Sequence, residues 1–373
     1  MKKIYLLFIS ALFILPAISL TVKGQLIPKD YSLIIQPAFG SVVINDQNGF
    51  LQGKLYGIDI SYLKDISRSE DNWIKRIHAK SYGIGFVMRD LNHFNGYGNS
   101  APNSFGQAYG LISQLEVQLL KIGRAELKFS PELGLSYLTK TFFTNSPNRF
   151  IGTHINMTLK ADLTGEIPIT QNISLLAGAG TLHYSNGAFI IPNGGLNTLN
   201  VFAGMRFNHL SEIPPIPKKP EYLPYQKNSI ELGFGIGRRG IAETRQGKYR
   251  SGFYAGYNYR LNNLITLKGG FDAIYSYKYF DPLQTEGKYK YYAASYDQRR
   301  LGLSLGADIN IWKLAINAQA GDYLYFKRFY DHIKWYWRFG PTYFITPRLG
   351  IQTKVYMHLS QADYINYGLV YQF

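Results

Sequence analysis

The sequence predicts an all-β protein that spans a membrane as an antiparallel β-barrel, and three observations lead to this prediction. A basic start with Lys2 and Lys3 precedes an apolar run at residues 4–20, which is typical of a secretory signal. From residue 25 onwards, apolar and polar side chains alternate in runs of about ten residues. The chain contains 31 tyrosines and 23 phenylalanines and ends on Phe373 after alternating aromatic residues. These features favour an apolar outer wall with aromatic girdles around a polar or small interior.

The amino-terminal segment predicts where the mature chain begins. We expect residues 1–24 to be a signal peptide cleaved near Gly24–Gln25, with a signal anchor as the alternative. No later stretch reaches the ~18 apolar residues that a membrane helix needs, so an embedded mature chain would cross the membrane with strands. Cysteine is absent, which excludes a disulfide scaffold, a thiol nucleophile and a cysteine-linked lipid anchor.

About sixteen strands are expected, eight on either side of a proline-rich segment. The first eight are predicted near 31–40, 52–62, 80–91, 107–121, 124–138, 153–165, 171–183 and 196–208. The second eight are predicted near 229–238, 250–260, 264–276, 297–310, 313–325, 332–343, 348–358 and 364–373. A soluble β-sandwich would show the same alternation, but the export signal and the terminal aromatic strand favour a membrane barrel.

The proline-rich segment divides the chain into two predicted units. Four prolines fall within Glu212–Pro220, and they lack the backbone donors that a sheet needs. We therefore predict a first barrel unit at 25–210, a periplasmic linker at 211–228 and a second, diverged unit at 229–373. Two tandem eight-stranded barrels are the preferred arrangement, and one barrel of about sixteen strands is the alternative. Glycine-rich inward rows in the second unit suit a narrow, filled interior.

The net charge of +16 raises the question of an anionic partner. The basic residues are scattered through strand-like segments and form no basic helix or cluster, which argues against nucleic acid. An anionic membrane surface is the better match.

The segment that carries chemistry is His183-Tyr184-Ser185-Asn186, followed by a Pro-Asn-Gly-Gly segment that ends at Asn197. His183 and Ser185 are two residues apart on a predicted strand, so their side chains share a face and can meet. Parity places both on the apolar, lipid-facing row, and Asn197 heads the matching row of the next strand. Polar side chains there are costly, and a substrate that arrives sideways from the lipid would explain them.

This segment resembles the lipid A 3-O-deacylase (PagL-like) and acyloxyacyl hydrolase family, an eight-stranded barrel of the bacterial outer membrane. The resemblance covers residues 26–208 and is specific over the last 26 or so. It implies that Ser185 is the nucleophile and His183 the general base, that Asn186 helps to form an oxyanion hole, and that Asn193 supports the site. The acidic third member of the family falls on Asn197, which is not acidic but can still orient an imidazole.

The resemblance also implies an activity and partners. The expected function is a carboxylic ester hydrolase that removes an ester-linked acyl chain, at the 3-position, from lipid A or lipopolysaccharide in the outer leaflet, without a metal or cofactor. Phospholipid or acyloxyacyl esters are alternative substrates, and a porin, adhesin or structural barrel with a degenerate motif is the alternative function. The terminal Phe373 is expected to engage the outer-membrane assembly machinery.

A second His-x-Ser, His358-Leu359-Ser360, has no following asparagine and lies on an inward row. Asp363 is nearby but is predicted to face outward. We therefore interpret this copy as structural. The glycine pattern at 235–240 imitates a dinucleotide-binding fingerprint but lacks the helix that should follow it.

Overall fold

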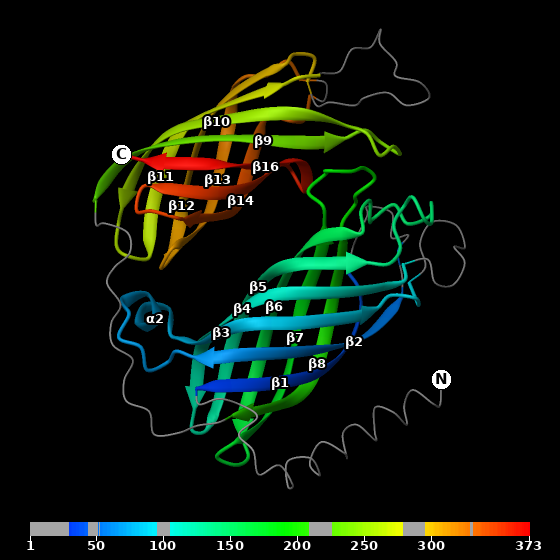
Figure 1. Cartoon of the computed structure of the whole chain (residues 1–373), viewed down its shortest axis with the longest axis vertical. Helices are drawn as coiled ribbons and strands as arrows, with labels where there is room; N and C mark the ends of the chain where they lie inside the picture. The colour runs from blue at the N-terminus through cyan, green and yellow to red at the C-terminus, as the bar shows by residue number, and fades with distance from the viewer. Residues whose placement is uncertain are drawn as a thin grey trace.

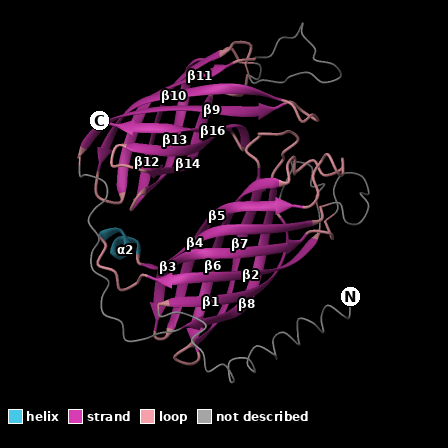
Figure 2. Ribbon diagram, in the orientation of Figure 1, coloured by secondary structure: helices cyan, strands magenta, loops and turns pink. Residues whose placement is uncertain are grey.

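A computed structural model describes residues 30–43, 51, 53–94, 105–208, 226–278, 295–328 and 331–373. Two closed antiparallel barrels of eight strands each account for most of these residues (Figures 1 and 2). The prediction of two tandem eight-stranded barrels is confirmed, and the alternative of one sixteen-stranded barrel is excluded. The signal peptide predicted at 1–24 and most of the linker predicted at 211–228 lie outside the described residues.

In the first barrel each strand pairs with the next along the chain, and pairing of β1 with β8 closes the sheet. Its strands are β1 (Tyr31–Val42), β2 (Lys54–Asp65), β3 (Ala79–Asp90), β4 (Gln107–Ile122), β5 (Ala125–Leu138), β6 (Ile155–Pro168), β7 (Ile173–Ser185) and β8 (Leu196–Asn208).

The second barrel repeats this order and closes by pairing β9 with β16. Its strands are β9 (Asn228–Gly240), β10 (Gly247–Arg260), β11 (Ile265–Ser276), β12 (Arg299–Ile311), β13 (Leu314–Tyr325), β14 (Trp335–Phe344), β15 (Leu349–His358) and β16 (Gln361–Gln372).

Apolar side chains cover the outer walls of both barrels. Leu111 on β4, Leu305 on β12 and Leu369 on β16 are 62%, 75% and 54% exposed. Their neighbours along each strand point inward, in keeping with the two-residue period of a strand. A soluble sandwich would bury these faces against each other, whereas a membrane barrel presents them to lipid.

Ion pairs fill the interior of the first barrel. Lys160 lies 3.2 Å from Asp59, 2.8 Å from Glu132 and 2.5 Å from Asp162. All four side chains are buried, and buried charges are tolerated when they are paired in this way.

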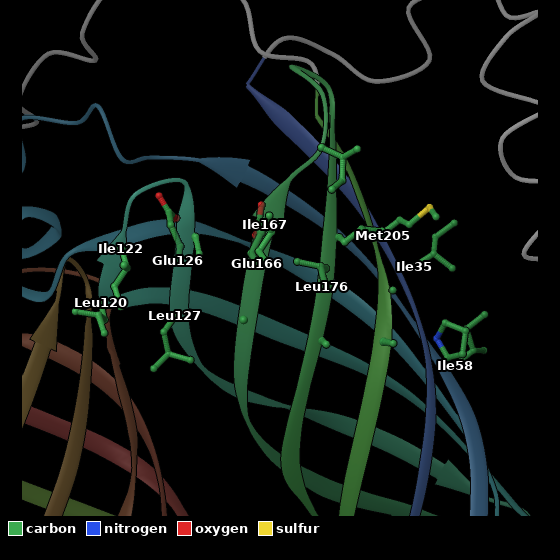
Figure 3. A pocket seen from close by; sticks show the side chains of 18 residues that line it. Ile35, Ile58, Leu120, Ile122, Glu126, Leu127, Glu166, Ile167, Leu176 and Met205 are labelled. Carbon is green, nitrogen blue, oxygen red and sulfur yellow. The ribbon is translucent and has the colours of Figure 1, made fainter.

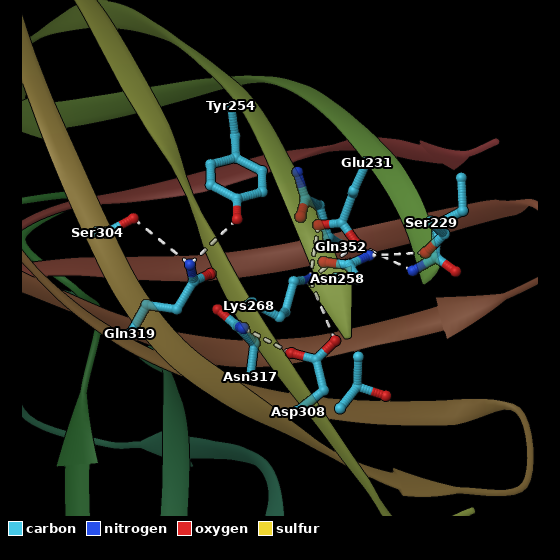
Figure 4. Close-up of polar contacts among 12 residues, drawn as sticks. Ser229, Glu231, Tyr254, Asn258, Lys268, Ser304, Asp308, Asn317, Gln319 and Gln352 are labelled. Carbon is cyan, nitrogen blue, oxygen red and sulfur yellow. Dashed lines mark hydrogen bonds and ion pairs between the residues drawn. The ribbon is translucent and has the colours of Figure 1, made fainter. Parts of the chain in front are cut away.

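The second barrel is filled by a similar polar network (Figure 4). Lys268 lies 2.6 Å from Glu231 and 3.1 Å from Asp308, and Asn317 donates to Asp308 over 2.6 Å. Glycine on the inward rows makes room for such side chains, because a Cβ at Gly235 would come within 1.8 Å of an interior amide oxygen. The interior is therefore packed, as its glycine-rich rows predict.

One short helix, α2 (Asn72–Ile77), connects β2 to β3 and is the only helix in the described part of the chain. Its six residues are too few to show a helical period, so the sequence does not predict this helix. Within the described ranges, no helix is long and apolar enough to span a membrane.

The two barrels are oriented with corresponding ends on the same side (Figure 1). The loop after β7, residues 186–195, lies at one end of the first barrel, and the turn after β9 lies at the same end of the second. Strand β8 finishes and β9 starts at the opposite end. The site described next therefore lies where a loop of the first barrel approaches the second.

Candidate functional site

The residues singled out by the motif gather at the rim of the first barrel. His183 and Ser185 are on the outward row of β7, and Asn197 is directly opposite His183 in the β7–β8 register. All three are half-buried, whereas the intervening Leu182 and Tyr184 are fully buried inside the barrel. Strand parity thus places the polar side chains on the outer wall.

The imidazole of His183 is oriented by an amide. Its Nδ1 lies 2.6 Å from Oδ1 of Asn197. Since an amide oxygen only accepts, Nδ1 carries the proton and Nε2 is the basic nitrogen. Nothing larger than a glycine fits beside this ring, because a Cβ on Gly195 would come within 2.8 Å of its Cε1 atom.

The hydroxyl of Ser185 receives two N–H donors. The side-chain Nδ2 of Asn193 lies 2.8 Å from Ser185 Oγ, and the backbone N–H of Gly187 lies 3.2 Å from it. No hydrogen bond joins Ser185 to His183 in the described part of the chain. Contacts of this kind are often long without substrate and shorten when it binds.

Asn186, expected to donate to an oxyanion, has its side chain directed elsewhere. Its Nδ2 donates to Thr153 Oγ1 (3.2 Å) and to the Ile190 carbonyl (3.1 Å). Its backbone N–H donates to Asn193 Oδ1 over 3.1 Å, which orients the Asn193 amide so that Nδ2 faces Ser185. Asn186 therefore shapes the loop, and Asn193 and Gly187 provide the donors near the hydroxyl. Spacing in the sequence cannot distinguish these roles.

The β5–β6 loop, residues 139–154, is hydrogen-bonded to the loop that carries the site. Gly194 N donates to the Arg149 carbonyl (3.2 Å) and Gly195 N to the Phe150 carbonyl (3.1 Å). Beneath the site, apolar side chains close this end of the barrel: Leu51, Leu55, Leu91, Phe94, Phe105, Ala108, Leu138, Phe150, Ile151, Leu182, Tyr184 and Leu196. The site is thus built on a packed, apolar support.

The second His-x-Ser forms no comparable site. His358 Nε2 is bound to the Tyr323 hydroxyl (2.5 Å), while Ser360 is exposed in a turn. The prediction that Asp363 faces outward was wrong. A register shift between Tyr356 and Met357 leaves Asp363 as the extra residue of a bulge, and it points inward to Arg250 (2.6 Å).

An apolar hollow lies away from the motif (Figure 3). It measures about 740 Å³ and is lined mainly by apolar side chains near the β4–β5 and β6–β7 turns, including Ile122, Ile167 and Met205. Those turns are at the end opposite residues 186–195. None of the motif residues lines it, so it is a lipid-facing depression rather than part of the site. No group of three or more potential metal ligands occurs in the ranges that the structure describes.

Comparison with protein families identifies the chain. The model for lipid A 3-O-deacylase (PagL) matches residues 58–206, and that for the acyloxyacyl hydrolase C-terminal domain matches residues 228–373. This chain belongs to the PagL-like family. The PagL-like protein is accordingly an outer-membrane β-barrel and a lipid A deacylase, hence an ester hydrolase with a lipid substrate.

Solved structures show more distant likenesses to the PagL-like chain. Neisserial surface protein A is 12% identical with a TM-score of 0.33, over 48% of this chain and 98% of its own. An outer membrane channel from Pseudomonas putida F1 is 10% identical with a TM-score of 0.24, over 93% of this chain and 97% of its own. No curated protein sequence matches the chain.

Proposed function

We propose that this protein removes the acyl chain esterified at the 3-position of lipid A, with Ser185 as the nucleophile and His183 as the general base. The observation that carries this proposal is the outward-facing Ser185 hydroxyl, which has two N–H donors on it and an oriented imidazole two residues away. An outward position at the rim suits an ester that reaches the site from the outer leaflet.

The reaction proceeds in two balanced steps. Ser185 Oγ attacks the ester carbonyl while His183 Nε2 takes the hydroxyl proton. The carbon–oxygen bond to the sugar then breaks, and the departing sugar oxygen takes the proton from the imidazolium. Water, activated by His183 in the same way, hydrolyses the acyl-serine and releases a fatty acid.

The developing oxyanion is stabilised by Asn193 Nδ2 and Gly187 N–H. Both donors lie within hydrogen-bond distance of Ser185 Oγ, so a tetrahedral carbon bound to that oxygen would place its own oxyanion near them. The oxyanion role expected of Asn186 is thereby reassigned to its neighbours in the loop.

The test is mass spectrometry of lipid A from cells that carry the full-length protein or its variants. Ser185→Ala and His183→Ala should abolish loss of the 3-linked chain while the barrels still shift mobility on heating. Asn193→Asp replaces the Nδ2 donor with a carboxylate oxygen and keeps the oxygen that Asn186 N–H uses, so kcat should fall by about 10²–10³ or more, because a donor is lost and a negative charge is added beside the oxyanion.

Ser360→Ala is the matched control, because Ser360 belongs to the exposed second His-x-Ser and should leave activity unchanged. Full activity in Ser185→Ala would overturn the mechanism. Fragment spectra that show a chain lost from another position, or lysophospholipid as product, would overturn the proposed substrate position.

A further inference from the structure

The loop that holds the site is bound by the second barrel. The tip of the β9–β10 hairpin, residues 238–247, lies against residues 186–191 at the end where both barrels carry these segments (Figure 1). Three hydrogen bonds run from the tip to loop carbonyls: Gly240 N to Ala188 O (2.8 Å), Glu243 N to Ile191 O (2.9 Å) and Arg238 Nη1 to Phe189 O (2.8 Å).

Side chains reinforce this backbone contact. The Arg238 guanidinium lies over the Phe189 ring, 4.6 Å from its centroid. Glu243 forms a 2.6 Å ion pair with Arg149, whose carbonyl accepts from Gly194 on the other side of the same loop. The tip and the β5–β6 loop therefore hold residues 186–195 from two sides.

We propose that the β9–β10 tip is a positioning element of the hydrolase site, so that the second barrel is required for efficient catalysis in the first. This inference rests on the proposed function. The held backbone includes Gly187, whose N–H points at Ser185 Oγ, and leads directly to Asn193. Misplacement of catalytic groups by about 1 Å can cost a hundredfold in rate, so loop placement matters to the chemistry.

Gly240 shows how tightly the two segments are fitted. A Cβ at this position would come within 2.6 Å of Ile191 N and 2.7 Å of Ile190 Cα. Both are backbone atoms, so any side chain at Gly240 must displace the loop. The φ angle of Gly240 is not positive, so a substitution acts through contact and not through backbone strain.

The first experiment compares steady-state kinetics of full-length Gly240→Val and wild type on lipid A in detergent micelles. We expect kcat to fall by about tenfold or more with KM nearly unchanged, because the donors near the oxyanion shift while the outer wall remains. Gly233→Ala is the control: it is on the same strand, and the atom nearest to its Cβ would be the side-chain Nε2 of Gln352, at 3.1 Å. Wild-type kcat in Gly240→Val would overturn the proposal.

The ion pair allows a rescue experiment. Glu243→Arg and Arg149→Glu should each lower kcat a few-fold, since an exposed pair is worth little on its own but like charges would push the tip from the loop. The double variant restores opposite charges and should recover most of the loss. If the two residues acted independently, the double variant would show the sum of the two single losses in kcat, and this result would count against the proposal.

A third measurement separates this inference from the proposed function. The chain has no cysteine, and a Cβ on Gly187 would lie 3.2 Å from Cβ of Ile365 on β16, near the ~3.5–4.5 Å of a disulfide. Gly187→Cys with Ile365→Cys should therefore oxidise to an intramolecular disulfide in outer membranes. Failure to do so, with Ser185→Ala still abolishing activity, would reject the contact and leave the proposed function standing. If the disulfide forms but the wild-type protein releases no fatty acid from lipid A, the contact is real, and both the proposed function and the positioning role are rejected.

Discussion

The third member of the site is an amide where a carboxylate would be the stronger partner. Asn197 Oδ1 accepts from His183 Nδ1 over 2.6 Å, so it fixes the tautomer and the ring orientation. It carries no charge, however, and in the proposed mechanism it could not stabilise the imidazolium that would form when Ser185 loses its proton. The site is therefore oriented but electrostatically weak.

Replacing Asn197 tests this weakness directly. Asn197→Asp is isosteric, keeps the acceptor and adds a negative charge, so we expect higher deacylation rates. Replacing the aspartate of a serine-histidine-aspartate triad by asparagine lowers kcat by roughly 10⁴-fold, and this value is the upper limit of the expected gain. Asn197→Leu, which removes the acceptor, should lower the rate. Initial rates of fatty-acid release measure both, and a sharp loss in Asn197→Asp with folded barrels would show that the asparagine has another role.

At the scale of elements, the 186–195 loop depends on glycine at one position beside the imidazole. Gly195 adopts φ +74°, a left-handed conformation that favours glycine, and has no room for a Cβ next to His183. Its backbone N–H is also held by the Phe150 carbonyl. Loop geometry and imidazole placement are therefore coupled at this residue.

Gly195→Ala should lower deacylation strongly while the barrels still fold, because the new methyl group displaces the imidazole. Gly123→Ala is the matched control: its φ of +58° is also left-handed, but a Cβ there meets nothing within 4 Å. Both variants bear similar backbone strain, so a difference in activity reports contact with His183. Equal deacylation rates in the two variants would show that Gly195 is not needed for the placement of the His183 imidazole.

Much of this could be predicted from the sequence, since the two-residue period gives strand positions and faces. All sixteen strands were predicted to within a few residues, and parity placed His183, Ser185 and Asn197 on the outer wall. The two-residue period does not reveal a local bulge, such as the one at Asp363. Contacts between distant segments were equally inaccessible, because no local pattern links Glu243 to Arg149.

For the whole molecule, the packed interiors bear on the porin alternative. Lys160 and Lys268 each lie at the centre of a buried network that occupies the interior of their barrel. A porin instead keeps a water-filled lumen. The described structure is therefore that of two filled cylinders.

We predict that the purified protein shows no stepwise ion conductance in planar lipid bilayers, under conditions in which a porin reconstituted in parallel does. The reason is that ions would have to displace paired, buried side chains in both barrels. Steady ohmic channels of uniform size would contradict this and restore the porin alternative.

The interior ion pairs also constrain how the first barrel can enter a bilayer. Arg206 on β8 pairs with Glu116 on β4 and lies 3.1 Å from Glu166 on β6. Because β8 is a neighbour of neither strand, no hairpin contains both partners, and a sheet that is still open would leave the Arg206 guanidinium without these carboxylates, at a cost of several kcal/mol. The charge of Arg206 is compensated only when the edge strands β1 and β8 pair and close the barrel. Insertion of single hairpins is thus disfavoured, and we expect the cylinder to enter the membrane as one cooperative unit.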